Sequence, residues 1–80
     1  MKKIGGGWAM ENLRKIRLRQ GLTQRDVAEA TGISQSVVSK YESGDRTPTC
    51  GNIILLAKFL DTSIDFLLGL TAEQAPYPRV

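Results

Sequence analysis

The stretch QRDVAEATGISQSVVSKYES, residues 24–43, decides the fold of this 80-residue chain. Its apolar residues recur at helical spacing on both sides of a four-residue turn at 31–34. A tight crossing of two helices needs a small residue at the contact point, which Ala28 supplies. It also needs a turn residue free to adopt positive φ, Gly32, and an apolar residue that points back, Val38. The spacing therefore predicts two short helices that cross tightly at this turn.

Capping residues and glycines set the bounds of these helices and of three more. Thr23 and Asp26 have the spacing of a capping box, and Ser34 is a good N-cap. The expected helices run over about 10–20, 24–31, 34–43 and 49–60, and a short fifth helix, capped by Thr62 or Ser63, ends at Gly69. No segment alternates apolar and polar residues as a strand would. The sequence predicts an all-α, compact five-helix domain over 10–70, with a flexible arm at 1–9 and a tail at 71–80.

Composition excludes several classes of function. The chain has no histidine and one cysteine, Cys50, so an internal disulfide, a His/Cys zinc site and a Ser-His or Cys-His nucleophile pair are all ruled out. Asp61 and Asp65 fit capping acids better than a catalytic pair. The longest apolar run, 53–57, is too short to span a membrane, and the basic start at 1–10 lacks the apolar stretch of a secretory signal. We therefore expect a soluble, cytoplasmic protein that is not an enzyme and holds no metal or cofactor.

Charge is unevenly distributed along the chain. Residues 1–25 carry seven Lys or Arg and one Glu, whereas residues 26–80 carry four Lys or Arg and seven Asp or Glu. The first part therefore has a net charge of +6 and the remainder −3. Such asymmetry is typical of a basic face that meets a polyanion, although a solvated helix rich in long cations has the same composition.

The detail of the central stretch adds to its spacing. Four motifs follow one another: GLTQ at 21–24, VA at 27–28, GISQ at 32–35 and VSKYESGDRTP at 38–48. In these motifs the chain resembles the Cro/C1-type (XRE) helix-turn-helix family, and the resemblance extends over about residues 11–69. It implies a lambda-repressor-like domain that binds operator DNA as a homodimer, with the 34–43 helix in the major groove. A sequence-specific transcriptional regulator, most simply a repressor at an inverted repeat, is the expected function; an antitoxin or adaptor-type interaction module with the same fold is the alternative.

The resemblance also assigns roles on the DNA-facing side. A recognition helix presents its N-terminal residues to base edges, and Gln35 carries a donor and an acceptor that suit adenine. The expected base-reading residues are Gln35, Ser36, Ser39 and Lys40. The expected phosphate or positioning residues are Gln24, Ser34, Ser43, Arg46 and Thr47. In the family the residue at Gln24 also braces the first residue of the recognition helix, which implies a contact between Gln24 and Gln35. A polar, solvated face is the alternative for all of them.

Arg17 and Glu42 fall where the family tends to place an ion pair. The pair would join the first helix to the end of the recognition helix. A partly buried pair adds little net stability, but removal of one partner leaves an uncompensated charge. We therefore expect Glu42 to support DNA binding without touching DNA.

The 49–60 helix has more apolar residues than one buried face needs. Its core should require only Ile53, Leu56, Ala57 and Leu60. A helix that is apolar all round is buried on more than one side, so the surplus predicts a homodimer. The expected interface residues are Leu55, Phe59, Phe66 and Leu70. Cover by the arm (Ile4, Trp8) or by the tail (Tyr77) is the alternative. No small-molecule ligand is expected.

Overall fold

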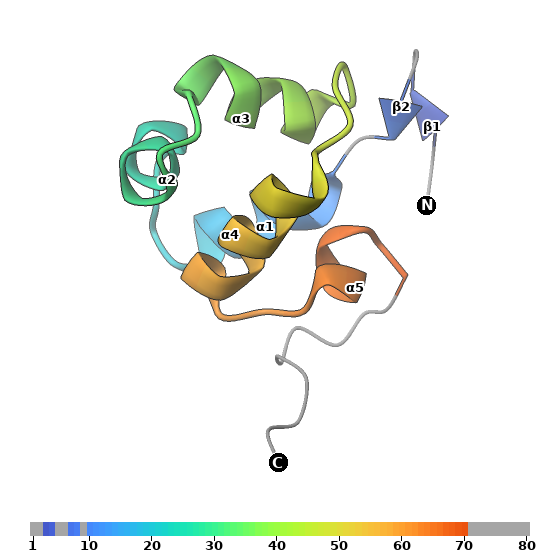
Figure 1. Ribbon diagram of the computed structural model, residues 1–80. Helices are drawn as coiled ribbons and strands as arrows, with labels where there is room; N and C mark the ends of the chain where they lie inside the picture. The colour runs from blue at the N-terminus through green and yellow to red at the C-terminus, as the bar shows by residue number, and fades with distance from the viewer. Residues whose placement is uncertain (1–2, 5–6, 9, 71–80) are drawn as a thin grey trace.

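Five helices form the domain in the computed structural model, which describes residues 3–4, 7–8 and 10–70. They are α1 (Glu11–Arg19), α2 (Gln24–Thr31), α3 (Gln35–Ser43), α4 (Cys50–Leu60) and α5 (Ile64–Leu67). In Figure 1, α3 lies above α1 and α4, α2 closes one side, and α5 lies below α3. The predicted five-helix domain is confirmed. No helix in the described part of the chain is long and apolar enough to cross a bilayer.

Two short strands precede the helices, and the sequence analysis did not predict them. Strand β1 (Lys3–Ile4) pairs with β2 (Gly7–Trp8) in antiparallel fashion, with Lys3 opposite Trp8 and Ile4 opposite Gly7. Two residues per strand are too few for alternation of apolar and polar side chains to be read from sequence. The expectation that 1–9 lacks regular structure is therefore wrong at these four residues. The division into arm, domain and tail stays a prediction, because 71–80 lie outside the described residues.

Local hydrogen bonds explain where the helices begin and end. Thr23 Oγ1 accepts the N–H of Asp26 at 3.0 Å, and Asp26 Oδ2 accepts the N–H of Thr23 at 2.8 Å, which confirms the capping box. Ser34 and Ser63 each cap a helix by accepting the backbone N–H three residues later. Gly32 ends α2 with φ of 78°, a left-handed conformation that glycine adopts without steric cost. The turn between α2 and α3 is therefore specified by sequence.

The capping box predicts how α2 responds to acid. Hydrogen bonds from the Thr23 backbone N–H and from the Thr23 side chain hold the pKa of the Asp26 carboxyl below its usual value. A lower pKa in the folded chain means that the box stabilises α2 above the unfolded pKa, and this is lost as the pH falls through the folded pKa. In an NMR titration, we expect Asp26 to titrate at lower pH than an aspartate in an unfolded peptide. Thr23→Ala should shift it toward the usual value, and an ordinary pKa in the wild type would contradict the box.

The core lies between the helices and contains the residues expected from their spacing. On α4 the buried residues are Ile53, Leu56, Ala57 and Leu60, as predicted. The other buried apolar residues are Met10, Leu13, Ile16, Val27, Ala28, Ile33, Val38, Tyr41, Phe66 and Leu67. Met10 was not predicted; its N–H donates to the carbonyl of Tyr41 at 3.1 Å, which brings the start of α1 to α3. Side chains of α1 also bind distant backbone, since Asn12 donates to the carbonyl of Phe66 and Gln20 to that of Leu60, both at 2.8 Å.

Candidate nucleic-acid interface

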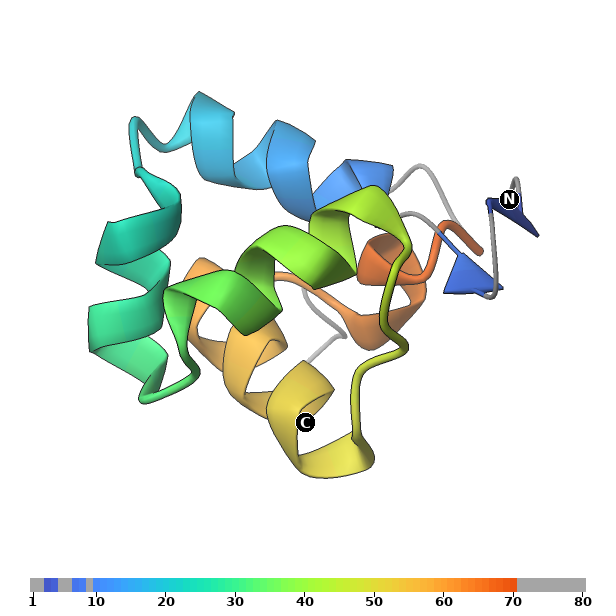
Figure 2. The same ribbon diagram turned by 90° about the horizontal axis from the view of Figure 1, so that it is seen from above.

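Helix α3 presents a continuous polar surface. Viewed from above in Figure 2, it lies nearest the viewer, and no other helix crosses over it. The exposed residues on it are Gln35, Ser36, Ser39, Lys40 and Ser43. At 3.6 residues per turn they fall within an arc of roughly 140°. All four residues expected to read bases therefore share one exposed face with Ser43.

The opposite side of α3 fixes its position in the domain. Val38 and Tyr41 are fully buried, and Val37 packs against the core while partly exposed. The Tyr41 hydroxyl accepts a hydrogen bond from Asn52 Nδ2 at 2.9 Å, which links α3 to the first turn of α4. Gly44 ends α3 in a left-handed conformation with φ of 87°. The polar face is thus carried on a rigid element rather than on a loop.

The polar side chains on α3 and at its N-cap, Ser34, differ in how many hydrogen bonds they already make within the domain. The side chain of Gln35 makes no hydrogen bond with the described part of the chain, so its amide is open to a partner. Ser34 accepts the N–H of Val37 at 3.2 Å and still has its hydroxyl proton to donate. Ser43 Oγ lies 3.2 Å from the carbonyl of Lys40 and 3.0 Å from Asp45 Oδ2, so its proton is already used. Sequence reasoning missed Asp45, whose carboxylate makes Ser43 a poorer phosphate donor.

The first residue of α2 has a different partner from the one expected. The predicted contact between Gln24 and Gln35 is replaced by a hydrogen bond from Gln24 Nε2 to Glu42 Oε1, at 3.1 Å. A carboxylate is a stronger acceptor than an amide, and Glu42 on the last turn of α3 lies within reach. The brace between α2 and α3 therefore exists, but it joins Gln24 to the C-terminal half of α3.

The ion pair predicted between Arg17 and Glu42 is present. Arg17 Nε lies 2.7 Å from Glu42 Oε2, and Arg17 Nη2 lies 3.0 Å from Oε1, so the pair is bidentate. The two side chains are only 8% and 5% exposed. Arg17 Nη1 also donates to the carbonyl of Leu22 at 2.9 Å. One carboxylate thus connects α1, α2 and α3 behind the polar face.

Not all cations of the N-terminal part are available to a ligand. Arg17 is buried and neutralised by Glu42, and Arg25 on α2 lies 3.5 Å from Glu29. The remaining cations of this part within the described helices are Arg14, Lys15 and Arg19, all exposed on α1. The net charge of the first 25 residues therefore overstates the positive charge available at α3.

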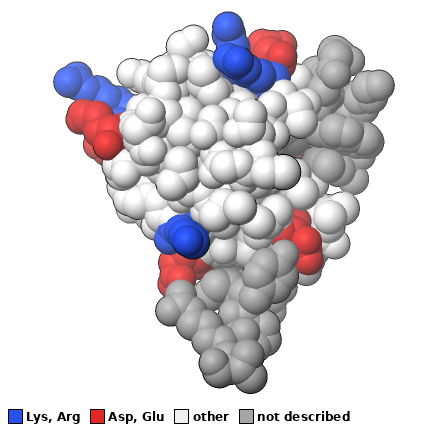
Figure 3. All heavy atoms as spheres, in the orientation of Figure 1, with Lys and Arg blue, Asp and Glu red and all other residues white. Residues whose placement is uncertain are grey.

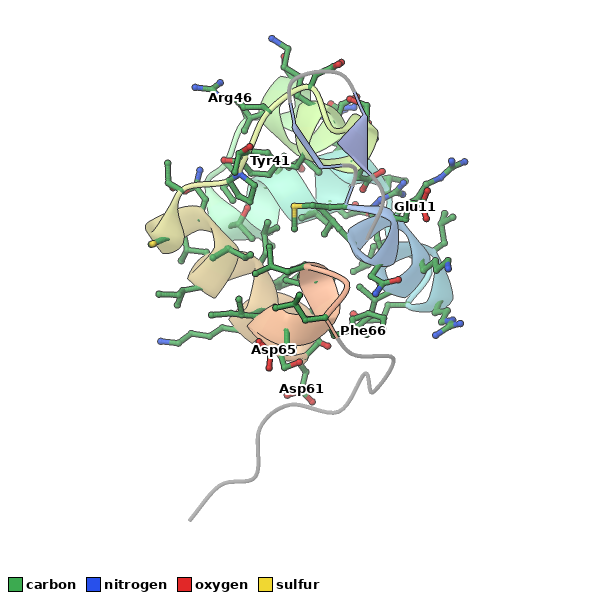
Figure 4. The ribbon with its side chains drawn as sticks, turned by 90° about the vertical axis from the view of Figure 1, so that its right-hand side faces the viewer. Glu11, Tyr41, Arg46, Asp61, Asp65 and Phe66 are labelled. Carbon is green, nitrogen blue, oxygen red and sulfur yellow. The ribbon has the colours of Figure 1, made fainter. Side chains whose placement is uncertain are left out.

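The loop after α3 adds polar groups beside the polar face. Arg46 and Thr47 are both exposed. In Figure 4, Arg46 points away from the domain near α3, whereas Asp61 and Asp65 lie at the opposite end. An open groove of about 280 Å³ lies between the 31–34 turn, this loop and α4. Arg46 lines it, with Leu55 of α4 among the other lining residues. The loop thus places a cation between α3 and the exposed surface of α4.

An apolar surface remains on α4. Ile54, Leu55 and Phe59 are 42%, 44% and 38% exposed, and Leu70 after α5 is 68% exposed. Figure 3 shows that the face over α4 carries few charged side chains. Lys58 is the exposed cation of α4, and at 3.6 residues per turn it falls on the same side of the helix as Ile54 and Leu55. The expectation that Phe66 belongs to this surface is wrong, because α5 turns it into the core, where it is 3% exposed. The alternative prediction was that the arm or the tail covers this surface. The side chains that it named, Ile4, Trp8 and Tyr77, lie outside the described part of the structure.

Comparison with known proteins identifies relatives of the domain. A protein-family model described as Helix-turn-helix matches residues 13–67. An uncharacterized HTH-type transcriptional regulator of Bacillus subtilis, YobD, is 36% identical over 70 residues, which cover 88% of this chain and 61% of YobD. The transcriptional repressor RstR of the cryptic phage CTXphi in Vibrio cholerae is 41% identical over 59 residues, covering 74% of this chain and 53% of RstR. The chain thus spans little more than half the length of these two proteins.

Solved structures contain the same fold. The restriction-modification controller protein C.AhdI from Aeromonas hydrophila superposes with a TM-score of 0.68 at 35% sequence identity. The match covers 71% of this chain and 86% of that chain. The arrangement of helices around α3 is therefore shared with a protein of similar length.

Proposed function

The chain belongs to the Cro/C1-type helix-turn-helix family, and on that basis we propose that it is a sequence-specific transcriptional regulator that binds double-stranded DNA. One observation carries the proposal: α3 has a rigid, buried back and an exposed front that bears Gln35, Ser36, Ser39 and Lys40. Amide, hydroxyl and ammonium groups are the ones that hydrogen-bond to base edges in the major groove. Binding without catalysis is therefore the activity that this surface serves.

Selection of random duplex DNA by the purified protein tests this function. At near-physiological salt, sequencing of the retained duplexes should reveal an enriched inverted repeat with half-sites about one helical turn apart. Enrichment of a single half-site would agree with sequence-specific DNA binding but would contradict the proposed dimer. No enrichment by folded protein would contradict sequence-specific binding, and it would favour the antitoxin or adaptor function of the same fold.

Arg46 is expected to contact phosphate rather than bases. It is exposed on the loop that follows α3, and Thr47 beside it is a weaker candidate for the same role. Because a phosphate contact carries no sequence information, Arg46→Ala should weaken binding to all duplexes about equally. It should also flatten the dependence of log K on log salt by about one unit. Titrations of the selected site and of a random duplex at several salt concentrations measure both effects, and a loss confined to the selected site would make Arg46 a base reader.

We propose that the exposed apolar surface of α4 joins two copies of the chain. Leu55 and Phe59 lie four residues apart, hence on one side of the helix, and Leu70 adds exposed apolar area. The low number of charges on this face in Figure 3 supports an interface between identical copies, because a two-fold axis can bring like charges together. Lys58 is the exposed α4 cation that such an interface would have to leave at its rim. A two-fold pair would present two α3 helices about 34 Å apart, the repeat of one DNA turn.

A charge substitution on this surface tests the dimer. The double variant Leu55→Lys, Phe59→Lys should keep its thermal unfolding transition, because both side chains are already exposed in one chain. Light scattering at micromolar concentration should give the mass of two chains for the wild type and of one for the variant. Leu18→Lys is the matched control, since Leu18 is 55% exposed on α1, and it should stay dimeric. A monomeric wild type would contradict the interface.

We propose that the protein acts as a repressor. We also propose that it acts in the cytoplasm, the compartment that holds the chromosome. A small domain on promoter DNA blocks polymerase without any further contact, and the relative RstR is named a transcriptional repressor. A reporter whose promoter overlaps the selected site should lose expression when the protein is produced. A gain of expression from the same promoter would instead make the protein an activator.

A further inference from the structure

The buried carboxylate of Glu42 accepts three hydrogen bonds from two helices. Arg17 supplies two of them, at 2.7 and 3.0 Å, and Gln24 Nε2 supplies the third, at 3.1 Å, to the same Oε1 that accepts Arg17 Nη2. With side-chain exposures of 8% and 5%, Arg17 and Glu42 are closed off from solvent. Gln24 is half-buried, so it is the member of this network that reaches the surface.

Gln24 lies at a helix end that favours an anion. It is the first residue of α2, where backbone N–H groups lack partners within the helix and favour an anion. Its side-chain amide carries two N–H donors, of which Glu42 takes one. The second N–H remains available beside the N-terminus of α2, where the capping box already uses the N–H of Asp26 and places the Asp26 carboxylate on the N–H of Thr23.

Charge balance decides whether an anion can approach this amide. A lone carboxylate behind Gln24 would repel a phosphate, particularly because low-dielectric surroundings screen it weakly. The bidentate contact with Arg17 neutralises Glu42, and the third donor of Arg17 is fixed on the carbonyl of Leu22 at 2.9 Å. The network therefore presents an oriented neutral donor rather than a net charge.

We propose that Glu42 is a positioning residue for DNA backbone binding: it holds one N–H of Gln24 so that the other points at a phosphate, while Arg17 cancels the charge of the carboxylate. The inference rests on the proposed DNA binding. It gives the buried pair a role beyond holding α3, because it makes the phosphate contact of α2 depend on a residue of α3.

NMR of the wild-type protein gives the most direct test. The two Nε2 protons of Gln24, assigned by their loss in Gln24→Ala, should respond differently to the selected duplex. The proton bonded to Glu42 should keep its chemical shift, and the other should move downfield. Gln20 is the matched control, because its amide donates to the carbonyl of Leu60 at the end of α4 and should not respond. Equal movement of both Gln24 protons, or of neither, would overturn the proposal.

A set of four proteins measures how far the contribution of Gln24 to DNA binding depends on the Arg17–Glu42 pair. Gln24→Ala is made in the wild type and in the variant Arg17→Met, Glu42→Leu, which leaves no charge buried and should therefore fold. In the wild type, Gln24→Ala should weaken binding to the selected duplex on the order of fivefold, the value of one neutral hydrogen bond. In the apolar background the same change should cost less than about twofold. An equal cost in both backgrounds, or none in the wild type, would overturn the proposal and leave DNA binding intact. Absence of binding by the wild type would refute the proposed function itself, before any variant is compared.

Discussion

Replacement of Glu42 by alanine is expected to lower the free energy of unfolding by about 3–5 kcal/mol. The reason is the charge that remains: Arg17 is 7% exposed and would lose two short hydrogen bonds to a carboxylate. Because folded domains are stable by only about 5–15 kcal/mol, this change would remove a large fraction of the stability of the domain. Urea unfolding followed by circular dichroism measures it, and DNA affinity should fall with it although Glu42 touches no DNA.

Two comparison variants separate the burial of the pair from its charge. Glu29→Ala removes the exposed ion pair between Arg25 and Glu29, whose side chains are 77% and 62% exposed, respectively. This change should lower the free energy of unfolding by at most about 0.5 kcal/mol. Replacement of both buried partners, Arg17→Met with Glu42→Leu, should restore most of the stability lost in Glu42→Ala, because no unpaired charge remains. A Glu42→Ala protein as stable as the wild type would show that the pair does not hold α3.

Replacement of Gln35 by alanine should cost on the order of 1–3 kcal/mol in binding to the selected site. Gln35 is the first residue of α3. Its side chain is exposed and makes no hydrogen bond to the described residues, so its amide donor and acceptor are both available. A side-chain amide pairs with adenine through two hydrogen bonds, and alanine can make neither. The preference for one base pair in each half-site should therefore relax, while the helix loses only an exposed side chain.

Affinities for two duplexes, the selected site and a random sequence, show whether Gln35 contacts a base or the DNA backbone. The Gln35→Ala protein should bind a random duplex as the wild type does and bind the selected site more weakly. Gln20→Ala provides a glutamine control off the recognition helix, and its affinity for both duplexes should stay unchanged. Equal weakening on both duplexes would show that Gln35 contacts the backbone instead of a base.

Much of the fold could be predicted because its signals are local. The Thr23–Asp26 capping box and the left-handed Gly32 depend on residues within a few positions of each other. The buried positions of α4 follow from the helical repeat, which sets one face against the core. The strand pair at β1 and β2 was missed because it involves two residues on each side, too few to create a pattern.

The candidate site was predicted less completely, since its parts come from different helices. The exposure of Gln35 and Lys40 followed from the apolar positions on the other side of α3. The partner of Gln24 did not, because the choice between Gln35 and Glu42 depends on how α2 crosses α3. Phe66 was misplaced for a similar reason: the turn before α5 determines which of its apolar side chains faces the core.

The sequence by itself determined which residues form each helix, which face of α3 is polar and that the chain belongs to a DNA-binding family. These properties depend on spacing, capping and motif, which are read along the chain. Only the tertiary structure decided that one carboxylate joins α1, α2 and α3, and that Met10 and Phe66 are buried. The physical reason is that hydrogen-bond partners and buried contacts depend on separation in space. For segments far apart in the sequence, that separation is fixed only when the helices pack together.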